Sequence, residues 1–591
     1  MSIYPRLRQP STQNGIAFQA DPTTEFGPTT ELDPTTEFGP TMAFSPKRRG
    51  KPRVRRVVAW MITVLAGLLV FLALIAPNQL PELTPGAFAR LPVEGLIGLG
   101  LLLVLPGRAR TVVAVLAGVL LGLLSIIKIL DLGFYATLSR PFDPALDWTF
   151  VKDGVAFLTT SIGRIATIGA VIAIVALIVA LPVLMTLSIR RLTRLMLRHR
   201  RPAGGVLLAL GAAWVACALL GTQIVPGDPV AAHSAAALTY DNVLQVRAGL
   251  RDPKTFAAQI AVDPFRDTPN NQLLTGLRGK DVILAFVESY GVSAIQDPKL
   301  APPVDAALAA GDQELKAAGY SSRSAYLTSP TYGGGSWLAH STLLSGLWIN
   351  NQQRYNTLVK TQRLTLTSAF KRADWRTVAV VPDVTRAWPE GAFYGYNKVY
   401  AQHDLGYQGP NFGWAVMPDQ FALSAFQKAE RAAPHPPLMT EMALVSSHAP
   451  WAPIPSLVDW NKLGDGSIFT PMKAAEDTAT VVWHNPDRVR SQYAQSIAYS
   501  LTSLITYVQK YGGKNLVLIF LGDHQAAPII SGNKASHNVP ITIVAHDPAV
   551  LDRISSWGWS TGLKPAATAP VWPMSAFRNQ FLTAFGSKPK P

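Results

Sequence analysis

The strongest constraint on the fold of this chain is an apolar region between Val57 and Val225, in which Leu, Val, Ala, Ile and Gly dominate. Polar and basic residues interrupt this region and leave five apolar spans. Because a helix of about 20 apolar residues crosses the hydrocarbon core of a bilayer, four spans are comfortably long and the second is marginal. The pattern predicts a module of five transmembrane helices, at residues 57–76, 91–106, 111–130, 165–189 and 203–225.

Basic residues lie beside these spans and account for much of the formal net charge of +16. Seven Lys or Arg residues fall within residues 47–56, two within 108–110 and six within 190–201. Connections rich in Lys and Arg stay on the cytoplasmic side of a membrane. Since these three segments are alternate connections, we expect a cytoplasmic N-terminus and an extracytoplasmic location for everything after Val225. The charge is therefore a topology signal, and we expect no nucleic-acid partner.

The single cysteine, Cys217, excludes several classes of site. It lies inside an apolar span, so the chain has no intramolecular disulfide, no cysteine-rich metal site and no cysteine nucleophile. The 591 residues exceed one compact domain, so we expect several units. These are a basic cytoplasmic tail at 1–56, the membrane module at 57–225, a linker and juxtamembrane segment at 226–278 and a soluble domain at 279–591.

The N-terminal tail contains an internal repeat. The sequence DPTTEFGPT occurs at residues 21–29 and again at 33–41, in a segment rich in Pro, Thr and Gly. A segment of this composition buries too little apolar surface to fold, so we expect it to be disordered. It is either a solvated tail or a regulatory segment, in which a kinase and a phosphothreonine reader act on Thr23, Thr24, Thr35 or Thr36.

After residue 226 the chain alternates short apolar runs with helical patterns, which is typical of a sheet flanked by helices. We therefore predict an α/β domain with a mixed sheet and strands at residues 282–287, 377–381, 442–445, 516–521 and 541–544. Polar residues follow four of these strands, namely Glu288, Asp383, His448 and the pair Asp523 and His524. In open α/β sheets ligands bind at the carboxyl ends of the strands, so we expect these side chains to form one site.

Glu288, Asp523 and His524 offer two carboxylates and an imidazole. This donor set suits one hard or borderline divalent cation with a coordination position left open. Each residue alone is also compatible with a structural role, since Gly-Asp-His after a strand can form a turn with a helix cap. Their combination at one edge of the sheet favours a metal site.

A glycine-rich segment, TYGGGSWLAHSTLLSG, spans residues 331–346. Its glycines allow the backbone to approach an anion closely, and the apolar pattern after Ser336 predicts a helix that ends near Gly346. A hydroxyl at a helix N-terminus beside a cation can be held as an alkoxide, so Ser336 is the expected nucleophile. The alternative is that Ser336 is only the N-cap of this helix.

The order of these motifs resembles that of a known family. A strand ending in Glu, the glycine-rich segment with its hydroxyl, then SSHAP, LGDH and SHNVP follow one another between residues 280 and 545. In this order the chain is similar to membrane-bound sulfatase-like phosphotransferases of the alkaline phosphatase/sulfatase superfamily. It resembles lipoteichoic acid synthase above all and, more distantly, lipid A phosphoethanolamine transferase, and five spans before the domain match as well.

The resemblance implies roles for individual residues. It implies that Glu288, Asp523 and His524 bind one divalent metal ion together with Ser336, which is also the nucleophile. Mn²⁺ is the expected ion, with Mg²⁺ or Zn²⁺ as alternatives. It also implies that His448 in SSHAP, His537 in SHNVP and Trp388 bind the substrate. Asp383 is added to this group because of its position after a predicted strand. His448 and His537 each have a structural alternative, a histidine satisfied by backbone groups.

The chain departs from the family pattern at two places. The synthase carries Trp-Asn-Arg in its glycerol-phosphate pocket, whereas this chain has Trp388-Pro389-Glu390, so Arg386 is the nearby substitute for the arginine. Sulfatases need a Cys/Ser-x-Pro-x-Arg run to make formylglycine, and the soluble domain contains no such run. Sulfate-ester hydrolysis is therefore not expected.

The resemblance implies a bacterial inner-membrane enzyme. It would transfer a phospho-headgroup from a membrane phospholipid to a cell-envelope acceptor through a phospho-serine, as phosphoglycerol and phosphoethanolamine transferases do. One alternative is a membrane-anchored phosphodiesterase, phosphatase or other sulfatase-like hydrolase, in which water is the acceptor. Another is a membrane sensor with a decayed catalytic domain, against which the complete set of Glu, Ser, Asp and His argues.

Overall fold

The computed structural model describes residues 52–587, except residues 150, 152–153, 156–157, 160–162, 226–227, 386 and 534. The chain divides at Ala59 into two units, and every contact discussed below lies within the second, Trp60–Pro591. The tail repeats and their threonines lie outside the described residues, so their proposed disorder and phosphorylation rest on the sequence alone.

Within the described N-terminal residues, four helices are long and apolar enough to cross a membrane. Large apolar side chains on these helices are exposed, for example Ile165 at 89% and Leu219 at 82%, which suits contact with lipid chains. The predicted second span is a helix of only 12 residues, or roughly 18 Å, so five crossing helices are not confirmed. The helices are α1 (Pro52–Ile75), α2 (Val93–Val104), α3 (Gly107–Leu138), α5 (Arg164–Arg198) and α6 (Arg200–Leu220).

The segment after α6 is more structured than a simple linker. Two short strands, β2 (Gln223–Val225) and β3 (Asp228–Pro229), pair with each other, and β4 (Ala231–Ala232) pairs with β1 (Leu91–Pro92). The long helix α7 (Ser234–Ala261) follows.

Residues at the C-terminal end of this segment pack into the soluble domain. Phe256 of α7 is fully buried against Leu338 and Leu347, and Asp263 forms a buried ion pair with Arg578. The last part of residues 226–278 therefore belongs to the packing of the domain.

The soluble domain is built on one mixed sheet, which confirms the predicted α/β architecture. The strand order is β12-β6-β11-β10-β5-β9-β7-β8, and β13 also pairs with β6. From β10 to β8 neighbouring strands are parallel, whereas β11 runs antiparallel to β10 and β6. The strands are β5 (Asp281–Val287), β6 (Ser321–Thr328), β7 (Arg376–Val381), β8 (Lys398–Ala401), β9 (Leu438–Leu444), β10 (Leu516–Gly522), β11 (Asn538–Ala545), β12 (Ser560–Thr561) and β13 (Val571–Pro573).

The five predicted strands correspond to β5, β7, β9, β10 and β11, and β9 begins four residues earlier than expected. Every residue of β5, β9 and β10 is buried, which explains their nearly continuous apolar runs, because helices cover both faces of a parallel sheet. The few polar residues in these strands, such as Glu441 in β9, are therefore buried and require hydrogen-bond or ionic partners.

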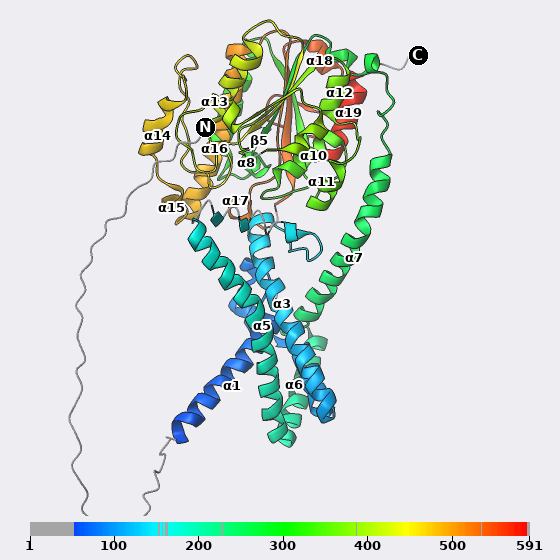
Figure 1. Cartoon of the computed structure of the whole chain (residues 1–591), viewed down its shortest axis with the longest axis vertical. Helices are drawn as coiled ribbons and strands as arrows, with labels where there is room; N and C mark the ends of the chain where they lie inside the picture. Colours follow the sequence, from blue (N-terminus) through cyan, green and yellow to red (C-terminus); the bar gives the residue numbers. More distant parts are fainter. Residues whose placement is uncertain are drawn as a thin grey trace, which may run out of the picture. The chain divides into compact units, whose positions relative to one another are not determined.

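Helices flank the sheet on both sides, as Figure 1 shows, with α13 and α16 on one side and α10, α12 and α19 on the other. Ridges of apolar residues on α16, such as Ile497 and Leu504, are fully buried against the sheet layer. The helices of the domain are α8 (Ser293–Gln296), α9 (Ala301–Ala317), α10 (Ser336–Ser345), α11 (Gln352–Leu358), α12 (Leu366–Arg372), α13 (Asp419–Phe426), α14 (Thr470–Ala475), α15 (Ala479–Val482), α16 (Pro486–Tyr511), α17 (Pro528–Ser531), α18 (Pro548–Asp552) and α19 (Phe577–Phe585).

Candidate active site

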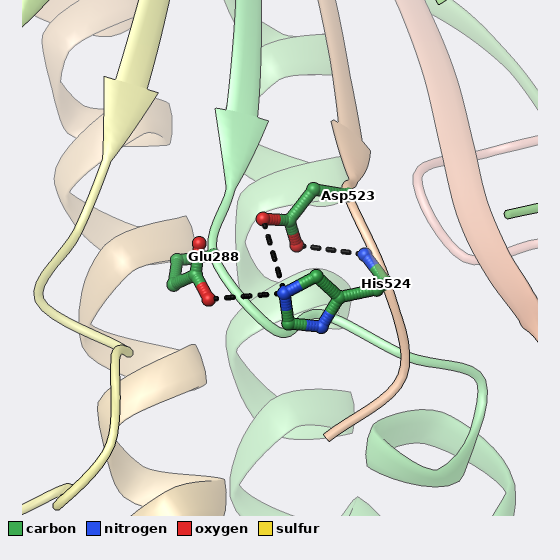
Figure 2. Close-up of side chains that lie close together, drawn as sticks. All are labelled: Glu288, Asp523 and His524. Carbon is green, nitrogen blue, oxygen red and sulfur yellow. Dashed lines mark hydrogen bonds and ion pairs between the residues drawn. The ribbon is translucent and has the colours of Figure 1, made fainter. Parts of the chain in front are cut away.

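Three buried side chains meet at the carboxyl edge of the central parallel strands. Glu288 directly follows β5, and Asp523 and His524 follow the adjacent strand β10. One ligand atom from each of the three lies within 4.8 Å of the others, and Figure 2 shows them pointing toward a common space. The parallel register of β5 and β10 causes this meeting, because it ends both strands at the same level.

The Asp523 carboxylate is oriented by the backbone. Its Oδ1 atom accepts hydrogen bonds from the backbone N–H of Ser289, at 2.8 Å, and of His524, at 2.7 Å. Its Oδ2 atom is buried and has no hydrogen-bond partner among the described residues. A buried carboxylate oxygen without a partner is costly, so Oδ2 is suited to bind a cation.

The His524 ring is oriented in the same way. Its Nδ1 atom lies 3.0 Å from the carbonyl oxygen of Gln525, so Nδ1 carries the proton that it donates. Nε2 therefore faces the site, 3.3 Å from Glu288 Oε1 and 3.6 Å from Asp523 Oδ2. A hydrogen bond from the second ring nitrogen to a carbonyl is how metal-binding histidines are usually fixed.

The pKa values of Glu288, Asp523 and His524 are shifted because two buried carboxylates share a single cationic partner. Burial raises the pKa of Asp523, and the neighbouring Glu288 raises it further, to about 7. Burial lowers the pKa of His524, but Asp523 and Glu288 outweigh it and bring that pKa to about 9. Burial opposes ionisation of Glu288 as well, yet the His524 charge keeps the pKa of Glu288 well below its usual value. In this buried site Asp523 and His524 therefore retain protons near neutral pH. A divalent cation would supply the positive charge in place of these protons.

Ser336 brings a hydroxyl to the same cluster. Its Oγ atom donates to Glu288 Oε2 at 2.8 Å and lies 3.2 Å from His524 Nε2. The alternative that Ser336 is an N-cap is wrong, because Ser336 is the first residue of α10 and Gly335 is its N-cap. Gly333 and Gly335 have φ angles of +70° and +82°, which a residue with a side chain adopts only with strain. These glycines let the chain turn sharply enough to aim Ser336 at the metal-type ligands.

The neighbouring hydroxyls are engaged elsewhere. Ser341 and Thr342 in α10 are fully buried and bond to the carbonyls of Trp337 and Leu338, one turn back along the helix. Ser329 donates to the carbonyl oxygen of Asp523 at 2.6 Å and so supports the strand end. Of the hydroxyls discussed here, Ser336 is the one that the structure brings to the cluster.

The structure places the two further histidines differently. His448 is half-buried at the end of β9, where its ring stacks on Trp414 with ring centroids 5.2 Å apart and its Nδ1 lies 2.5 Å from the carbonyl of Ala449. His537 is exposed beside Tyr332, and among the described residues no hydrogen bond or ion pair joins its ring to the metal-type cluster. His537 still lies at the same edge of the sheet, because it precedes the antiparallel strand β11.

Trp388 and Asp383 follow β7, at the same edge of the sheet. The ring centroid of Trp388 lies 5.7 Å from that of Tyr394 and 6.2 Å from that of Tyr396. Tyr394 in turn contacts Ser341 of α10, so this aromatic cluster lies next to α10. Asp383 is exposed just beyond the strand. Arg386, the proposed substitute for the missing arginine, lies outside the described residues.

Several supporting residues were not identified from the sequence. Ser289 follows Glu288 in a left-handed conformation, with φ of +58°, and its hydroxyl donates to Glu288 Oε1. A Cβ atom on Gly522 would lie 1.9 Å from the carbonyl oxygen of Tyr290, so only glycine fits before Asp523. Asp419, fully buried, accepts from the backbone N–H groups of Val445 and Ser446 and so fixes the turn that carries His448. The signal available in the sequence was weak, since each acts through a partner distant along the chain.

No protein-family model and no curated protein sequence matches the chain. Among solved structures, the integral membrane protein lipooligosaccharide phosphoethanolamine transferase A from Neisseria meningitidis is 11% identical, with a TM-score of 0.41, over 90% of this chain and 95% of that chain. The lipoteichoic acid synthase LtaP from Listeria monocytogenes is 13% identical, with a TM-score of 0.32, over 57% of this chain and 78% of that chain. The phosphoglycerol transferase GacH from Streptococcus pyogenes is 14% identical, with a TM-score of 0.33, over 55% of this chain and 78% of that chain. The similar structures thus include the two kinds of transferase, lipoteichoic acid synthase and phosphoethanolamine transferase, that the motifs in the sequence resemble.

Proposed function

We propose that this chain is a membrane-anchored phosphotransferase that moves a phospho-headgroup from a membrane phospholipid to an extracytoplasmic acceptor through a phospho-serine. The observation that carries the proposal is the position of Ser336 Oγ, 2.8 Å from Glu288 and 3.2 Å from His524 at the start of α10. A hydroxyl held by a metal-type ligand set at a helix N-terminus is suited to attack a phosphorus atom.

The donor atoms fit a divalent cation. Asp523 Oδ2 lacks a hydrogen-bond partner among the described residues, His524 Nε2 faces the cluster, and Glu288 and the Ser336 hydroxyl supply further oxygens. Two carboxylates, an imidazole and a hydroxyl suit Mn²⁺ best, with Mg²⁺ and Zn²⁺ as alternatives. Such an ion, when bound, neutralises negative charge and favours the deprotonated form of the serine hydroxyl.

The chain's own residues account for the group transfer. In the first half-reaction the Ser336 hydroxyl loses its proton, the Oγ–phosphorus bond forms, the bond from phosphorus to the lipid alcohol oxygen breaks, and that oxygen takes up a proton. In the second, an acceptor hydroxyl loses its proton, its oxygen bonds to phosphorus, the Oγ–phosphorus bond breaks, and Oγ takes up a proton. The backbone N–H groups at the start of α10 and the glycines before it face the charge on the phosphoryl oxygens.

The products distinguish transfer from hydrolysis. Purified full-length enzyme would be incubated with Mn²⁺, a panel of phospholipids and candidate acceptors, and the products examined by mass spectrometry. We expect a lipid alcohol, a phospho-adduct on Ser336 and a headgroup-modified acceptor. Release of free headgroup phosphate with no modified acceptor would instead identify a phosphodiesterase or phosphatase, and no released lipid alcohol for any phospholipid would contradict both.

Activity should depend on a bound divalent cation. Removing an outer-shell partner of a metal ligand already lowers metal affinity or activity about 10- to 100-fold, so Asp523→Asn should lower bound metal and turnover at least that much. Elemental analysis and the transfer assay would measure both. Asp547→Asn, which alters a partly exposed carboxylate paired with Lys280, is the control and should leave both unchanged. Full activity in excess chelator would contradict the metal site.

We further propose that residues 279–591 are the catalytic domain, that it is extracytoplasmic and that the chain lies in the inner membrane of a bacterium. Whether the short helix α2 crosses the membrane determines on which side the soluble domain lies. If α2 did not cross, four crossings would return the domain to the side of the N-terminus and would place the basic residues 108–110 outside. The positive-inside rule therefore favours a crossing by α2 together with its flanking residues, despite its length.

Reporter fusions test this topology. Alkaline phosphatase fused after Thr222 or after Pro591 should be active, because it folds only outside the cytoplasm, whereas a fusion after His199 between α5 and α6 should be inactive. The reverse pattern would show that α2 does not cross and that the domain is cytoplasmic.

A further inference from the structure

A third histidine lies beside the site, and neither the motifs nor the proposed reaction has assigned it a role. His340 is in α10, one helical turn after Ser336, so the two residues share a face of the helix. Its ring stacks on Phe286 of β5, with ring centroids 3.7 Å apart and an interplanar angle of 13°. Phe286 and Glu288 are two residues apart on one strand, so they project to the same side of the sheet.

The ring of His340 is held in one orientation by a buried carboxylate. Its Nδ1 atom lies 3.0 Å from Glu441 Oε1, and the hydroxyl of Tyr396 donates to the other oxygen of the same carboxylate. The Glu441 side chain is only 4% exposed, so its charge is compensated mainly by these two partners. Because an ionised carboxylate only accepts, Nδ1 carries the proton, and the role of the histidine depends on Nε2.

The register of the sheet gives the direction of Nε2. Glu441 in β9 pairs with Leu284, which lies four residues before Glu288 on β5, and Phe286 lies between these two levels. Nδ1 thus lies on the side of Glu441, which precedes Phe286 along the strands, and this register favours an Nε2 that faces the edge where Glu288 and Asp523 lie. Within the described part of the chain Nε2 makes no hydrogen bond, and the side chain is 16% exposed.

The charged groups around the His340 ring favour protonation of Nε2, which makes it a hydrogen-bond donor. Burial lowers the pKa of His340, whereas the hydrogen bond and charge of Glu441, which is not one of the metal-type ligands, are the largest causes that raise it, and the net pKa is raised. A protonated Nε2 in this position offers an N–H to an anion beside Ser336, much as a carboxylate-oriented imidazole does in catalytic triads.

We propose that His340 is a further catalytic residue, whose Nε2–H donates a hydrogen bond to a non-bridging oxygen of the phosphoryl group that Ser336 attacks. Glu441 and Tyr396 are positioning residues, which act through the His340 ring. The inference rests on the proposed function in one respect, since that function identifies the bound anion as a phosphoryl group.

Two substitutions separate hydrogen bonding from packing. His340→Phe keeps a ring that stacks on Phe286 but has no donor, and His340→Gln keeps an N–H donor near the position of Nε2 without the ring. A hydrogen bond to a charged group is worth about 1.5–3 kcal/mol, which corresponds to about 10- to 150-fold in affinity. The probe is inorganic phosphate, measured as an inhibitor of the Mn²⁺-loaded full-length enzyme acting on a chromogenic phosphodiester and as a ligand by calorimetry.

We expect His340→Phe to weaken phosphate binding and to lower kcat/KM about 10- to 150-fold, with metal content unchanged. Its melting temperature should fall, because the buried Glu441 carboxylate loses one of its two partners. His340→Gln should recover part of the loss, and Tyr396→Phe should show a smaller loss through the ring. His546→Phe is the matched control, because His546 also contacts an aromatic ring, that of Tyr320, but follows β11 at the opposite edge of the sheet. It should bind phosphate as the wild type does.

Two results would overturn the proposal. Wild-type phosphate affinity in His340→Phe would show that Nε2 does not contact the anion. A loss of bound metal in both variants that matches the loss of phosphate affinity, or equal phosphate affinities of His340→Phe and His340→Gln, would show a purely structural role. Because calorimetric phosphate binding needs no phospholipid, failure of headgroup transfer in the wild type would refute the proposed function and leave this measurement unaffected.

Discussion

Ser336→Ala is expected to abolish turnover and the covalent phospho-adduct while the chain still folds and inserts into the membrane. Loss of a catalytic nucleophile lowers kcat by at least about a thousandfold in enzymes of this kind of mechanism. The structural effect should be small, since among the described residues the Ser336 hydroxyl bonds only to Glu288 and His524, and the N-cap of α10 is Gly335. We expect a change in stability of about 1 kcal/mol or less.

The measurement is single-turnover formation of phospho-enzyme from a labelled phospholipid, followed by peptide mapping. Ser341→Ala, a second hydroxyl of the same helix that bonds to Tyr394 and the carbonyl of Trp337, is the control and should still form the adduct. Phospho-enzyme at another hydroxyl in Ser336→Ala would refute the assignment. Loss of bound metal in the same variant would mean that Ser336 acts chiefly as a ligand.

Asp263→Asn is expected to destabilise the soluble domain more than any surface substitution. The side chains of Asp263 and Arg578 are both fully buried and form an ion pair of 2.6 Å, and Arg363 Nε lies 3.4 Å from the same carboxylate. Without the carboxylate charge, two buried guanidinium groups lack their counter-charge. Breaking a buried pair in this way costs about 3–5 kcal/mol. This corresponds to a decrease of roughly 10 °C in melting temperature for a domain of this size.

Thermal unfolding of the full-length protein in detergent, followed by tryptophan fluorescence, measures the difference. Asp305→Asn breaks an exposed ion pair with Lys564 and is the matched control, with an expected effect below about 1 kcal/mol. Equal melting temperatures for the two variants would show that Asp263 does not stabilise the fold.

The pH dependence of the Asp263 contribution follows from its environment. Burial raises the pKa of Asp263, but the Arg578 hydrogen bond and the charges of Arg578 and Arg363 outweigh it, and the net pKa is lowered. A carboxyl group with a lowered pKa stabilises the fold fully above its ordinary pKa of about 4, and this contribution is lost as the pH falls through the lower folded value. The difference between wild type and Asp263→Asn should therefore be constant near neutral pH and shrink in strong acid.

The sequence by itself determined the local structure and the chemistry at the ends of the strands. Apolar runs indicated β5, β7, β9, β10 and β11, because a strand buried on both faces needs an almost continuous apolar stretch. The polar residue that ends such a run is conspicuous, which is why Glu288, Asp523 and His524 could be proposed as one site. The glycines before Ser336 likewise indicated a sharp turn into a helix.

Tertiary structure decided which groups complete the site and hold the domain together. The N-cap position, the short length of α2 and the direction of β11, which places His537 at the active edge, depend on geometry that periodicity does not encode. The pairing of His340 with Glu441 and that of Asp263 with Arg578 join residues 101 and 315 positions apart. Local patterns reflect the neighbours of a residue along the chain, whereas these partners are fixed only by strand order, register and helix packing.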